Sequence, residues 1–383
     1  MFEIKTLNKI AAVGLNRLDP SSFSVDSGAE PEGILVRSAA MHDMAFPESL
    51  LAIARAGAGV NNIPLDRCTE AGIAVFNTPG ANANAVKELA IAALLLASRD
   101  VVAGIEWCRG LTGADVDKQV EKGKSQFVGP ELMGKTLGVI GLGAVGGLVA
   151  NAAVALGMNV IGCDPYLSVT NALHLSRAVK VADQKTLFAE ADYISIHSPL
   201  LDSTRNMICA ETIDQMKQGV RIINLSRAGL VNDVDMLAAL AGGQVARYVT
   251  DFPNTALVNQ PGVVAIPHLG ASTPESEDNC AVMAANELSD YLLNGNIRNS
   301  VNLPNAELTR SGAARLCVVH KNLPNMLSAV LGIVSADGLN IANMVNKSRG
   351  EIAYTIIDVD SALPADVAEH VLALDGVVRV RTL

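Results

Sequence analysis

The sequence predicts an α/β protein with doubly wound parallel sheets, followed by a smaller α+β module. Apolar strands alternate with helical stretches up to about residue 293, which is the pattern of repeated βαβ units. Residues 136–163 show one such unit without a single charged side chain. Strands of a parallel sheet are buried on both faces and therefore form continuous apolar runs. Residues 314–383 follow a different order, strand–helix–strand–strand–helix–strand, which predicts a separate α+β fold.

The composition is that of a globular protein, with 50% hydrophobic and 18% charged residues. The net charge of −10 argues against a nucleic-acid partner, because nucleic acid requires a basic face. The start, MFEIKTLNKI, lacks the apolar core of a signal peptide, and the glycines of 136–163 argue against a membrane span. Six cysteines are scattered without CxxC spacing. We therefore expect a cytoplasmic protein with reduced thiols, no metal site and no membrane partner.

A glycine turn inside 136–163 predicts a dinucleotide site. Gly141, Gly143 and Gly146 form GxGxxG between a strand, 137–140, and a helix that begins near Val145. Such a turn brings the backbone close to a pyrophosphate, and the helix N-terminus supplies free N–H groups and positive dipole. Asp164 follows 18 residues after the third glycine and can accept hydrogen bonds from ribose hydroxyls. Since Pro165 and Tyr166 offer no cation for a 2′-phosphate, the predicted cofactor is NAD.

Further strands and helices surround this unit. The predicted strands are 33–36, 51–54, 73–76, 159–163, 193–196, 221–225, 245–251 and 263–266. The predicted helices are 85–98 and 279–293, and the polar passage 109–131 is expected to be a surface connection. The segments predicted for the C-terminal module are 314–319, 324–336, 340–347, 351–359, 364–373 and 376–382.

Three strand ends carry side chains that suit the oxidation of an alcohol. Arg227 follows the strand 221–225 and can form a two-pronged, charge-assisted contact with a carboxylate, or it lies on a solvated loop. Asp251 can accept from a nicotinamide amide or simply cap a turn. His268 follows the last strand, and histidine is the base whose pKa suits neutral pH, although many histidines are structural. His197 lies inside an apolar strand end, and we assign it no catalytic role.

Four motifs together resemble the D-isomer-specific 2-hydroxyacid dehydrogenase family: GLGAVG with Asp164, ADYISIHSPL (191–200), INLSRAGLV (223–231) and IPHLGAST (266–273). The resemblance implies that Arg227 anchors the substrate, that His268 is the catalytic base and that the protein is a homodimer or homotetramer. It implies two domains that close over a cleft. The family's cofactor contacts match Ala144, Val145, Asp164, Leu225, Ser226, Arg227, Asp251 and His268 to Ala271, with Gly270 among them.

The resemblance also predicts the substrate half. The segments 36–38 and 55–62, each at a strand end, match substrate-binding segments of the family. Two arginines suit a small phosphorylated 2-hydroxy acid better than an unphosphorylated one, although both could be surface side chains. Two other functions stay open, a glyoxylate or hydroxypyruvate reductase and a non-catalytic NAD-sensing protein. The predicted substrate-binding residues are Arg37, Ser38, Arg55, Gly57, Ala58, Gly59 and Asn77.

The chain departs from the family pattern in its catalytic segment. The family usually has a glutamate between the equivalents of Asp251 and His268 that orients the histidine. Here residues 252–267 contain no carboxylate, and Glu275 is a weak substitute. Ala228 replaces a glycine that is common after the arginine. We therefore expect the enzyme to keep Arg227 and His268 but to differ in its pH behaviour.

The last residues resemble an ACT domain, a small ligand-sensing module. His320, Asn322 and Asn340 match its serine-contacting segments, which implies L-serine as an effector; a pure oligomerisation module is the alternative. Asn325 stands where the family has glycine.

These patterns predict three domains. We expect a flavodoxin-like substrate domain from residues 1–98 and 284–303 and a Rossmann NAD-binding domain from residues 99–283. A linker, 304–313, leads to an ACT-type regulatory domain, 314–383.

Overall fold

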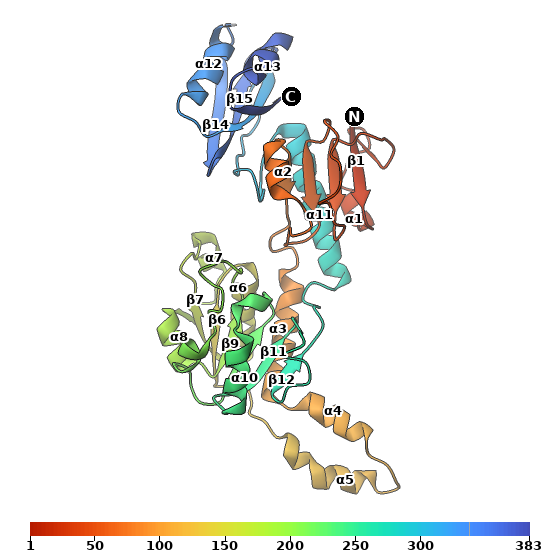
Figure 1. Cartoon of the computed structure of the whole chain (residues 1–383), viewed down its shortest axis with the longest axis vertical. Helices are drawn as coiled ribbons and strands as arrows, with labels where there is room; N and C mark the ends of the chain where they lie inside the picture. The colour runs from red at the N-terminus through yellow and green to blue at the C-terminus, as the bar shows by residue number, and fades with distance from the viewer. Residues whose placement is uncertain (337) are drawn as a thin grey trace. The chain divides into compact units, whose positions relative to one another are not determined.

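The structure is a computed structural model that describes residues 1–336 and 338–383. It divides into two compact units (Figure 1). Unit 1 consists of Met1–Ala81 and Glu277–Leu383, and unit 2 is Asn82–Ser276. The predicted boundary after residue 98 thus lies one helix beyond the observed division, because helix α3 (Ala83–Ser98) packs on α6 (Ala144–Ala155) and on strands of unit 2.

Unit 1 contains a parallel five-stranded sheet in the order β2-β1-β3-β4-β5. This is the flavodoxin-like order, as predicted. The pattern analysis missed β1 and β2, since the alternating side chains of FEIKTL are only half-buried and no long apolar run marks them. Two short helices, α1 (Ala12–Leu15) and α2 (Leu65–Glu70), connect the strands. The strands are β1 (Phe2–Leu7), β2 (Phe23–Val25), β3 (Gly33–Val36), β4 (Ala52–Arg55) and β5 (Ala74–Phe76).

Unit 2 contains a parallel seven-stranded sheet in the order β12-β11-β10-β9-β6-β7-β8. The order reverses between β6 and β9, and ligands of doubly wound sheets bind outside such a reversal, at the carboxyl ends of the strands. The Rossmann fold is therefore confirmed. The strands are β6 (Thr136–Ile140), β7 (Asn159–Cys163), β8 (Val179–Val181), β9 (Tyr193–Ile196), β10 (Val220–Asn224), β11 (Val245–Thr250) and β12 (Val263–Ala265).

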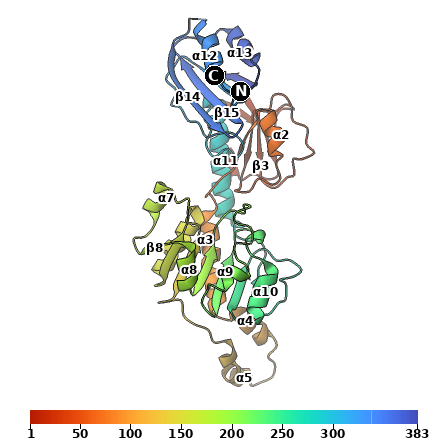
Figure 2. The ribbon, with the colours of Figure 1, turned by 60° about the vertical axis from the view of Figure 1, so that its left-hand side comes forward.

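Helices cover both faces of this sheet, which explains why its strands are apolar throughout (Figures 1 and 2). Helix α3 buries Val86, Ala90, Leu94 and Ala97, whose spacing forms one helical face. The other helices are α6, α7 (Val169–His174), α8 (Gln184–Glu190), α9 (Ala210–Ile213) and α10 (Asp233–Ala241), with the 3₁₀ turn η2 (Ala228–Leu230).

The passage 109–131 is not the plain surface connection that we predicted. Together with the residues before it, it forms a helical arm of α4 (Val101–Arg109), α5 (Val116–Gly123) and the 3₁₀ turn η1 (Lys124–Phe127). The many charged residues of this passage made its helical pattern hard to recognise from the sequence. None of the arm's residues is buried.

The C-terminal module confirms the predicted element order. Its antiparallel sheet has the order β14-β15-β13-β16, with α12 (Met326–Ala336) and α13 (Ala365–Leu372) packed on one face (Figure 2). Every residue of β15 is buried, because the opposite face packs against the long helix α11 (Pro274–Asn294). The strands are β13 (Ala314–Lys321), β14 (Ile341–Arg349), β15 (Ile352–Val359) and β16 (Val377–Thr382).

A buried ion pair ties this module to α11. The Arg315 and Asp358 side chains are wholly buried and joined by two hydrogen bonds, of 2.6 and 2.9 Å. Arg315 also donates to the carbonyl of Asn294, at the end of α11. A buried pair of this kind is costly unless its other donors find partners, and here Arg315 Nη2 also donates to the Leu308 carbonyl at 2.9 Å. Among the helices of the described residues, none combines the length and apolarity that crossing a bilayer requires.

Candidate active site

The glycine turn after β6 has the geometry that a phosphate group needs. Gly141 has a left-handed φ of 89°, and a Cβ there would lie 2.6 Å from the His197 carbonyl oxygen. Gly146 touches the Gly141 carbonyl so closely that a Cβ would overlap it. Gly143, by contrast, faces open space, and no side chain caps the N-terminus of α6. The turn therefore leaves free backbone N–H groups beside a cradle that a side chain at residue 143 would fill.

Asp164 lies at the end of β7 and is tied to this turn. Its Oδ2 accepts from the Leu142 N–H at 2.8 Å, and its Oδ1 accepts from the Tyr166 N–H at 2.8 Å. Each carboxylate oxygen keeps a lone pair, since a carboxylate offers about four acceptor sites. The half-exposed side chain can thus accept from ribose hydroxyls while it holds the turn. These features fit NAD.

His197 supports the turn from β9. Its side-chain Nε2 lies 2.8 Å from the Ser195 hydroxyl, and its backbone N–H donates to the Ile140 carbonyl at 2.7 Å. Burial lowers the pKa of His197 to about 4, so this imidazole is neutral at physiological pH. A neutral, hydrogen-bonded side chain suits a structural role beside the glycine turn.

Arg227 is presented by a buried asparagine that the sequence analysis missed. Asn224 ends β10 and is fully buried; its Nδ2 donates to the Arg227 carbonyl at 2.9 Å, and its Oδ1 accepts from the Ser226 N–H at 3.1 Å. These two bonds fix the turn that follows the strand. The Arg227 side chain is exposed, with Nη1 on the Ser226 carbonyl at 2.7 Å. Leu225 is buried at the same strand end.

His268 and Asp251 follow neighbouring strands, β12 and β11, paired at Thr250 and Ala265. The His268 ring is exposed and packs on Phe252, with ring centroids 4.8 Å apart. Asp251 is fully buried, and neither of its carboxylate oxygens has a hydrogen-bond partner among the described residues. Burial raises the pKa of Asp251, while the positive charges of His268 and Arg227 act in the opposite direction. The charge of Asp251 is therefore coupled to those of His268 and Arg227.

The predicted cofactor and catalytic residues of unit 2 gather at one edge of its sheet. They follow β6, β7, β10, β11 and β12, and the carboxyl ends of parallel strands share one edge. Ala144 and Val145 begin α6 there. Gly270 belongs to the same edge, since a Cβ on it would lie 3.5 Å from both Asp251 Oδ2 and Val86. Glu275 lies in the first turn of α11 and is exposed.

In unit 1, the predicted substrate arginines meet at the carboxyl ends of β3 and β4. Arg55 Nε donates to the Arg37 carbonyl at 3.0 Å. The Arg37 guanidinium is paired with Glu277 at 2.6 Å, and both side chains are partly exposed. The side chain of Ser38 is exposed beside them. This edge of the sheet thus carries two guanidinium groups, of which that of Arg37 is paired with a carboxylate and that of Arg55 is bonded to the Arg37 carbonyl.

The glycine loop after β4 is held by the loop after β5. Asn77 Nδ2 donates to the Ala58 carbonyl at 2.6 Å, and the Thr78 N–H donates to the Gly57 carbonyl at 3.2 Å. A Cβ on Gly57 would lie 2.7 Å from Arg55 Nη1, so the loop passes close to the guanidinium. The structure thereby brings Arg55, Gly57, Ala58 and Asn77 together, with Gly59 next in the chain.

Asn8 completes this edge, and sequence reasoning missed it. It follows β1 with a left-handed φ of 71°, and its Oδ1 accepts from the N–H groups of Ser38 and Ala39 at 3.0 and 2.7 Å. The position of an asparagine directly after FEIKTL could have indicated a turn at a strand end, but the strand itself was not predicted.

The residues predicted to contact L-serine lie at opposite ends of the C-terminal sheet: His320 and Asn322 are at the end where β13 pairs with Ile352, and Asn340 is at the end where β14 pairs with Val359. His320 is buried, with Nδ1 on the Lys321 carbonyl and Nε2 on the Thr355 hydroxyl, both at 2.8 Å. Asn322 donates to Gly350 and Asn340 to Asp360, and both asparagine side chains are exposed. Asn325 has a left-handed φ of 65°, the conformation in which glycine is usual.

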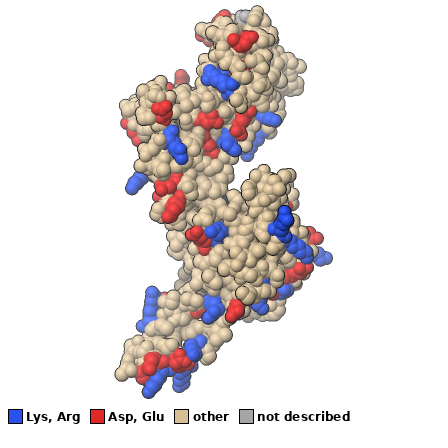
Figure 3. Space-filling model, turned by 180° about the vertical axis from the view of Figure 1, so that it is seen from behind, with Lys and Arg blue, Asp and Glu red and all other residues tan. Residues whose placement is uncertain are grey.

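On the face shown in Figure 3, basic and acidic side chains are interspersed. The described residues contain no cluster of three or more His, Cys, Asp or Glu side chains that could hold a metal ion.

Comparisons with known proteins identify the family of this chain. Residues 91–270 match the family described as D-isomer specific 2-hydroxyacid dehydrogenase, NAD binding domain. The D-3-phosphoglycerate dehydrogenase of Escherichia coli is 33% identical over 351 residues, which cover 88% of this chain and 82% of that protein. The chain belongs to the D-isomer-specific 2-hydroxyacid dehydrogenase family. Another relative in this family, the D-3-phosphoglycerate dehydrogenase of Archaeoglobus fulgidus, is 36% identical over 289 residues, 72% of this chain. The chain spans 52% of that longer protein.

Solved structures of the 2-hydroxyacid dehydrogenase family have the same fold. The NAD⁺-bound 3-phosphoglycerate dehydrogenase of Entamoeba histolytica has a TM-score of 0.61 and 26% identity, over 79% of this chain and 98% of that one. A glyoxylate reductase from Paecilomyes thermophila has a TM-score of 0.65 and 25% identity, over 78% of this chain and 98% of that one.

Proposed function

We propose that this chain oxidises 3-phospho-D-glycerate to 3-phosphooxypyruvate with NAD, the reaction that would open serine biosynthesis. The observation that carries the proposal is the pair of guanidinium groups, Arg37 and Arg55, at adjacent strand ends beside a glycine loop. Arginine guanidinium groups bind phosphate and carboxylate by paired, charge-assisted hydrogen bonds. A substrate without a phosphate has less need of two such groups. The relatives named D-3-phosphoglycerate dehydrogenase support the same substrate.

The residues of unit 2 would hold the cofactor. The open cradle at Gly143 and the N-terminus of α6 suit its pyrophosphate, and Asp164 suits the adenosine ribose. When bound, NAD accepts the hydride that leaves C2 of the hydroxy acid.

The chemistry assigned to the protein is proton transfer and charge stabilisation. In this proposal Arg227 binds the substrate carboxylate and polarises the reacting oxygen, while His268 accepts the hydroxyl proton. Loss of that proton and of the C2 hydride converts the alcohol into a ketone. The imidazolium that His268 becomes would be stabilised by the negative charge of the buried Asp251 carboxylate, to which it is electrostatically coupled.

An absorbance assay for NADH tests the proposal. We expect turnover with 3-phospho-D-glycerate and far less with D-glycerate, and a preference for NAD over NADP. Faster reduction of glyoxylate or hydroxypyruvate would instead favour a reductase, as in the Paecilomyes relative's name. Binding of NAD without turnover of any acid would favour an NAD-sensing protein.

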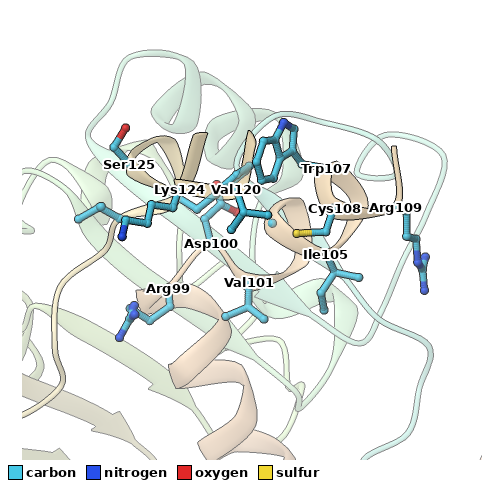
Figure 4. A pocket seen from close by; sticks show the side chains of 13 residues that line it. Arg99, Asp100, Val101, Ile105, Trp107, Cys108, Arg109, Val120, Lys124 and Ser125 are labelled. Carbon is cyan, nitrogen blue, oxygen red and sulfur yellow. The ribbon is translucent and has the colours of Figure 1, made fainter. Parts of the chain in front are cut away.

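We also propose that a second copy of this chain packs on the helical arm. The arm has no buried residue, and Val101 and Ile105 are 47% and 48% exposed. Between its helices lies a hollow of about 920 Å³, with apolar side chains that Figure 4 shows around Trp107 and Val120. An unpartnered apolar hollow of this size is typical of an interface.

Light scattering on Ile105→Lys tests this assembly. We expect a smaller particle than the parent protein, because a charge in the hollow would be desolvated. Val102→Lys is the matched control, as Val102 is 44% exposed on the same helix but does not line the hollow. A homodimer or homotetramer unaffected by Ile105→Lys would place the interface elsewhere.

The C-terminal sheet would act as an ACT-type sensor of L-serine. Asn322 and Asn340 are exposed and carry the amide groups that an amino acid needs, whereas His320 would have to exchange one of its present partners. A cytoplasmic location is proposed as well, since all six cysteines are free thiols.

A further inference from the structure

A segment from the second half of the chain occupies the free edge of the unit 1 sheet. Residues 299–302, here called the edge segment, run antiparallel to β5, with Ser300 opposite Phe76. The Val301 N–H donates to the Val75 carbonyl at 2.9 Å, and the Ser300 hydroxyl donates to the same oxygen at 3.0 Å. Asn302 Oδ1 accepts from the Val75 N–H at 2.8 Å. The edge segment thus satisfies backbone groups that an edge strand would expose.

The edge segment also reaches the loop that follows β5. The Asn299 carbonyl accepts from the Asn77 N–H, at a long 3.5 Å. Asn77 in turn holds the Ala58 carbonyl of the glycine loop through its side chain. The placement of Asn299 therefore bears on the loop 55–59, two hydrogen bonds away.

Helix α11 anchors Asn299 in an uncommon backbone conformation. Asn299 has a left-handed φ of 57°, which asparagine adopts more readily than most residues. Its Nδ2 donates to Glu287 Oε1 at 2.7 Å, and Glu287 is only 7% exposed. A buried carboxylate holding the side chain thus secures the conformation that aims the Asn299 carbonyl at Asn77.

The C-terminal sheet holds the same segment. Arg349, at the end of β14, donates from Nη1 to the Ser300 carbonyl at 2.9 Å. The edge segment is therefore bonded to β5, to α11 and to the C-terminal sheet at once.

We propose that Asn299 is a positioning residue for the substrate-binding loop 55–59, acting through Asn77, and that Arg349 links the C-terminal sheet to this loop through Ser300. The proposal rests on the proposed function for the identity of the loop's ligand. The hydrogen bonds that carry it are independent of that ligand.

Hydrogen exchange on the full-length protein tests the positioning without any substrate. The amides to follow are those of Ala56, Gly57, Asn77 and Thr78, all hydrogen-bonded in the structure. Asn299→Ala removes the anchor and the preference for left-handed backbone, and it is expected to speed their exchange about 5- to 10-fold, the worth of one hydrogen bond. Arg349→Gln is expected to speed the same amides to a smaller extent.

Asn294→Ala is the matched control. It also removes an amide–carboxylate bond of unit 1, to Asp290, but it leaves the edge segment intact. The slowest amides of β3 and β4 report on global unfolding and should not change in any variant. Unchanged exchange at the four amides in both test variants, or faster exchange throughout unit 1, would overturn the proposal.

Steady-state kinetics test whether the loop 55–59 binds the substrate. Asn299→Ala should raise KM for 3-phospho-D-glycerate about 5- to 10-fold with KM for NAD unchanged, and combination with Asn77→Ala should add little. Full additivity of the two substitutions would show that Asn299 does not act through Asn77. A parent protein that oxidises no 2-hydroxy acid would refute the proposed function, and the exchange result would still decide the positioning.

Discussion

Replacing Glu287 by Gln should change how the stability of this protein depends on pH. Glu287 is buried on α11, its Oε2 has no hydrogen-bond partner among the described residues, and burial raises the pKa of its carboxyl to about 7. The ordinary value is 4.5. The Asn299 amide and the charge of Arg298 oppose this rise without cancelling it. Gln resembles the protonated acid in shape and keeps an acceptor for Asn299.

The direction of the pH dependence follows from the protons that the folded and unfolded states bind at Glu287. Below about pH 4.5 the folded and unfolded states are both protonated at this group, so its stabilising contribution is complete. As the pH rises toward 7, the unfolded state releases the proton that the folded state keeps, and the free energy of unfolding falls. A difference between 4.5 and about 7 corresponds to a loss of roughly 3 kcal/mol at most, at 1.36 kcal/mol per pH unit.

Urea unfolding followed by circular dichroism measures this loss at pH 5.5, 7 and 8.5. The variant cannot ionise at residue 287, so its stability relative to the parent should rise by about 2 kcal/mol between pH 5.5 and pH 8.5, because the parent has already lost about 1.4 kcal/mol at pH 5.5. Glu307→Gln removes an exposed carboxylate of the same unit and should leave the pH dependence nearly unchanged. Parallel pH profiles for the parent and Glu287→Gln would refute the reasoning, because Glu287 would then ionise as it does in the unfolded chain.

Four further outcomes are expected. His268→Ala should lower kcat roughly 10²- to 10⁴-fold in the NADH assay with NAD affinity kept, as for loss of a general base; turnover within a few-fold of the parent would assign the proton to another group. Asp164→Ala should weaken NAD binding roughly 10-fold or more in a fluorescence titration and narrow the preference over NADP, whereas a parent that uses both cofactors equally would contradict the ribose contact. Arg55→Ala should cost about 1.5–3 kcal/mol of substrate binding, judged from kcat/KM, with phosphoglycerate but little with glycerate; equal losses would exclude a phosphate role. Asn340→Ala should abolish the heat of L-serine binding in calorimetry, and an absence of heat from the parent at millimolar serine would leave the C-terminal sheet as an assembly module.

The sequence alone determined the parts of this protein that are local in the chain. The turn from Gly141 to Gly146, the strand before it and Asp164 lie within one βαβ unit, so spacing was enough to predict their arrangement. The same holds for Arg227 and His268 at strand ends, because parallel strands present their carboxyl ends at one edge. These predictions needed only a period, a turn and an order of elements, and the fold confirms the framework on which they depend.

Only the tertiary structure decided the contacts between distant residues. Asn302 completes β5 from 227 positions away, and no local pattern marks either partner. The arm's apolar hollow is formed by two charged helices, whose few apolar side chains are informative only once the helices pack together. Glu287 lies on an ordinary helical stretch, and its pKa is raised because folding removes it from water without giving its second oxygen a partner. Desolvation of this kind is a property of the packed interior, which the order of residues along the chain does not express.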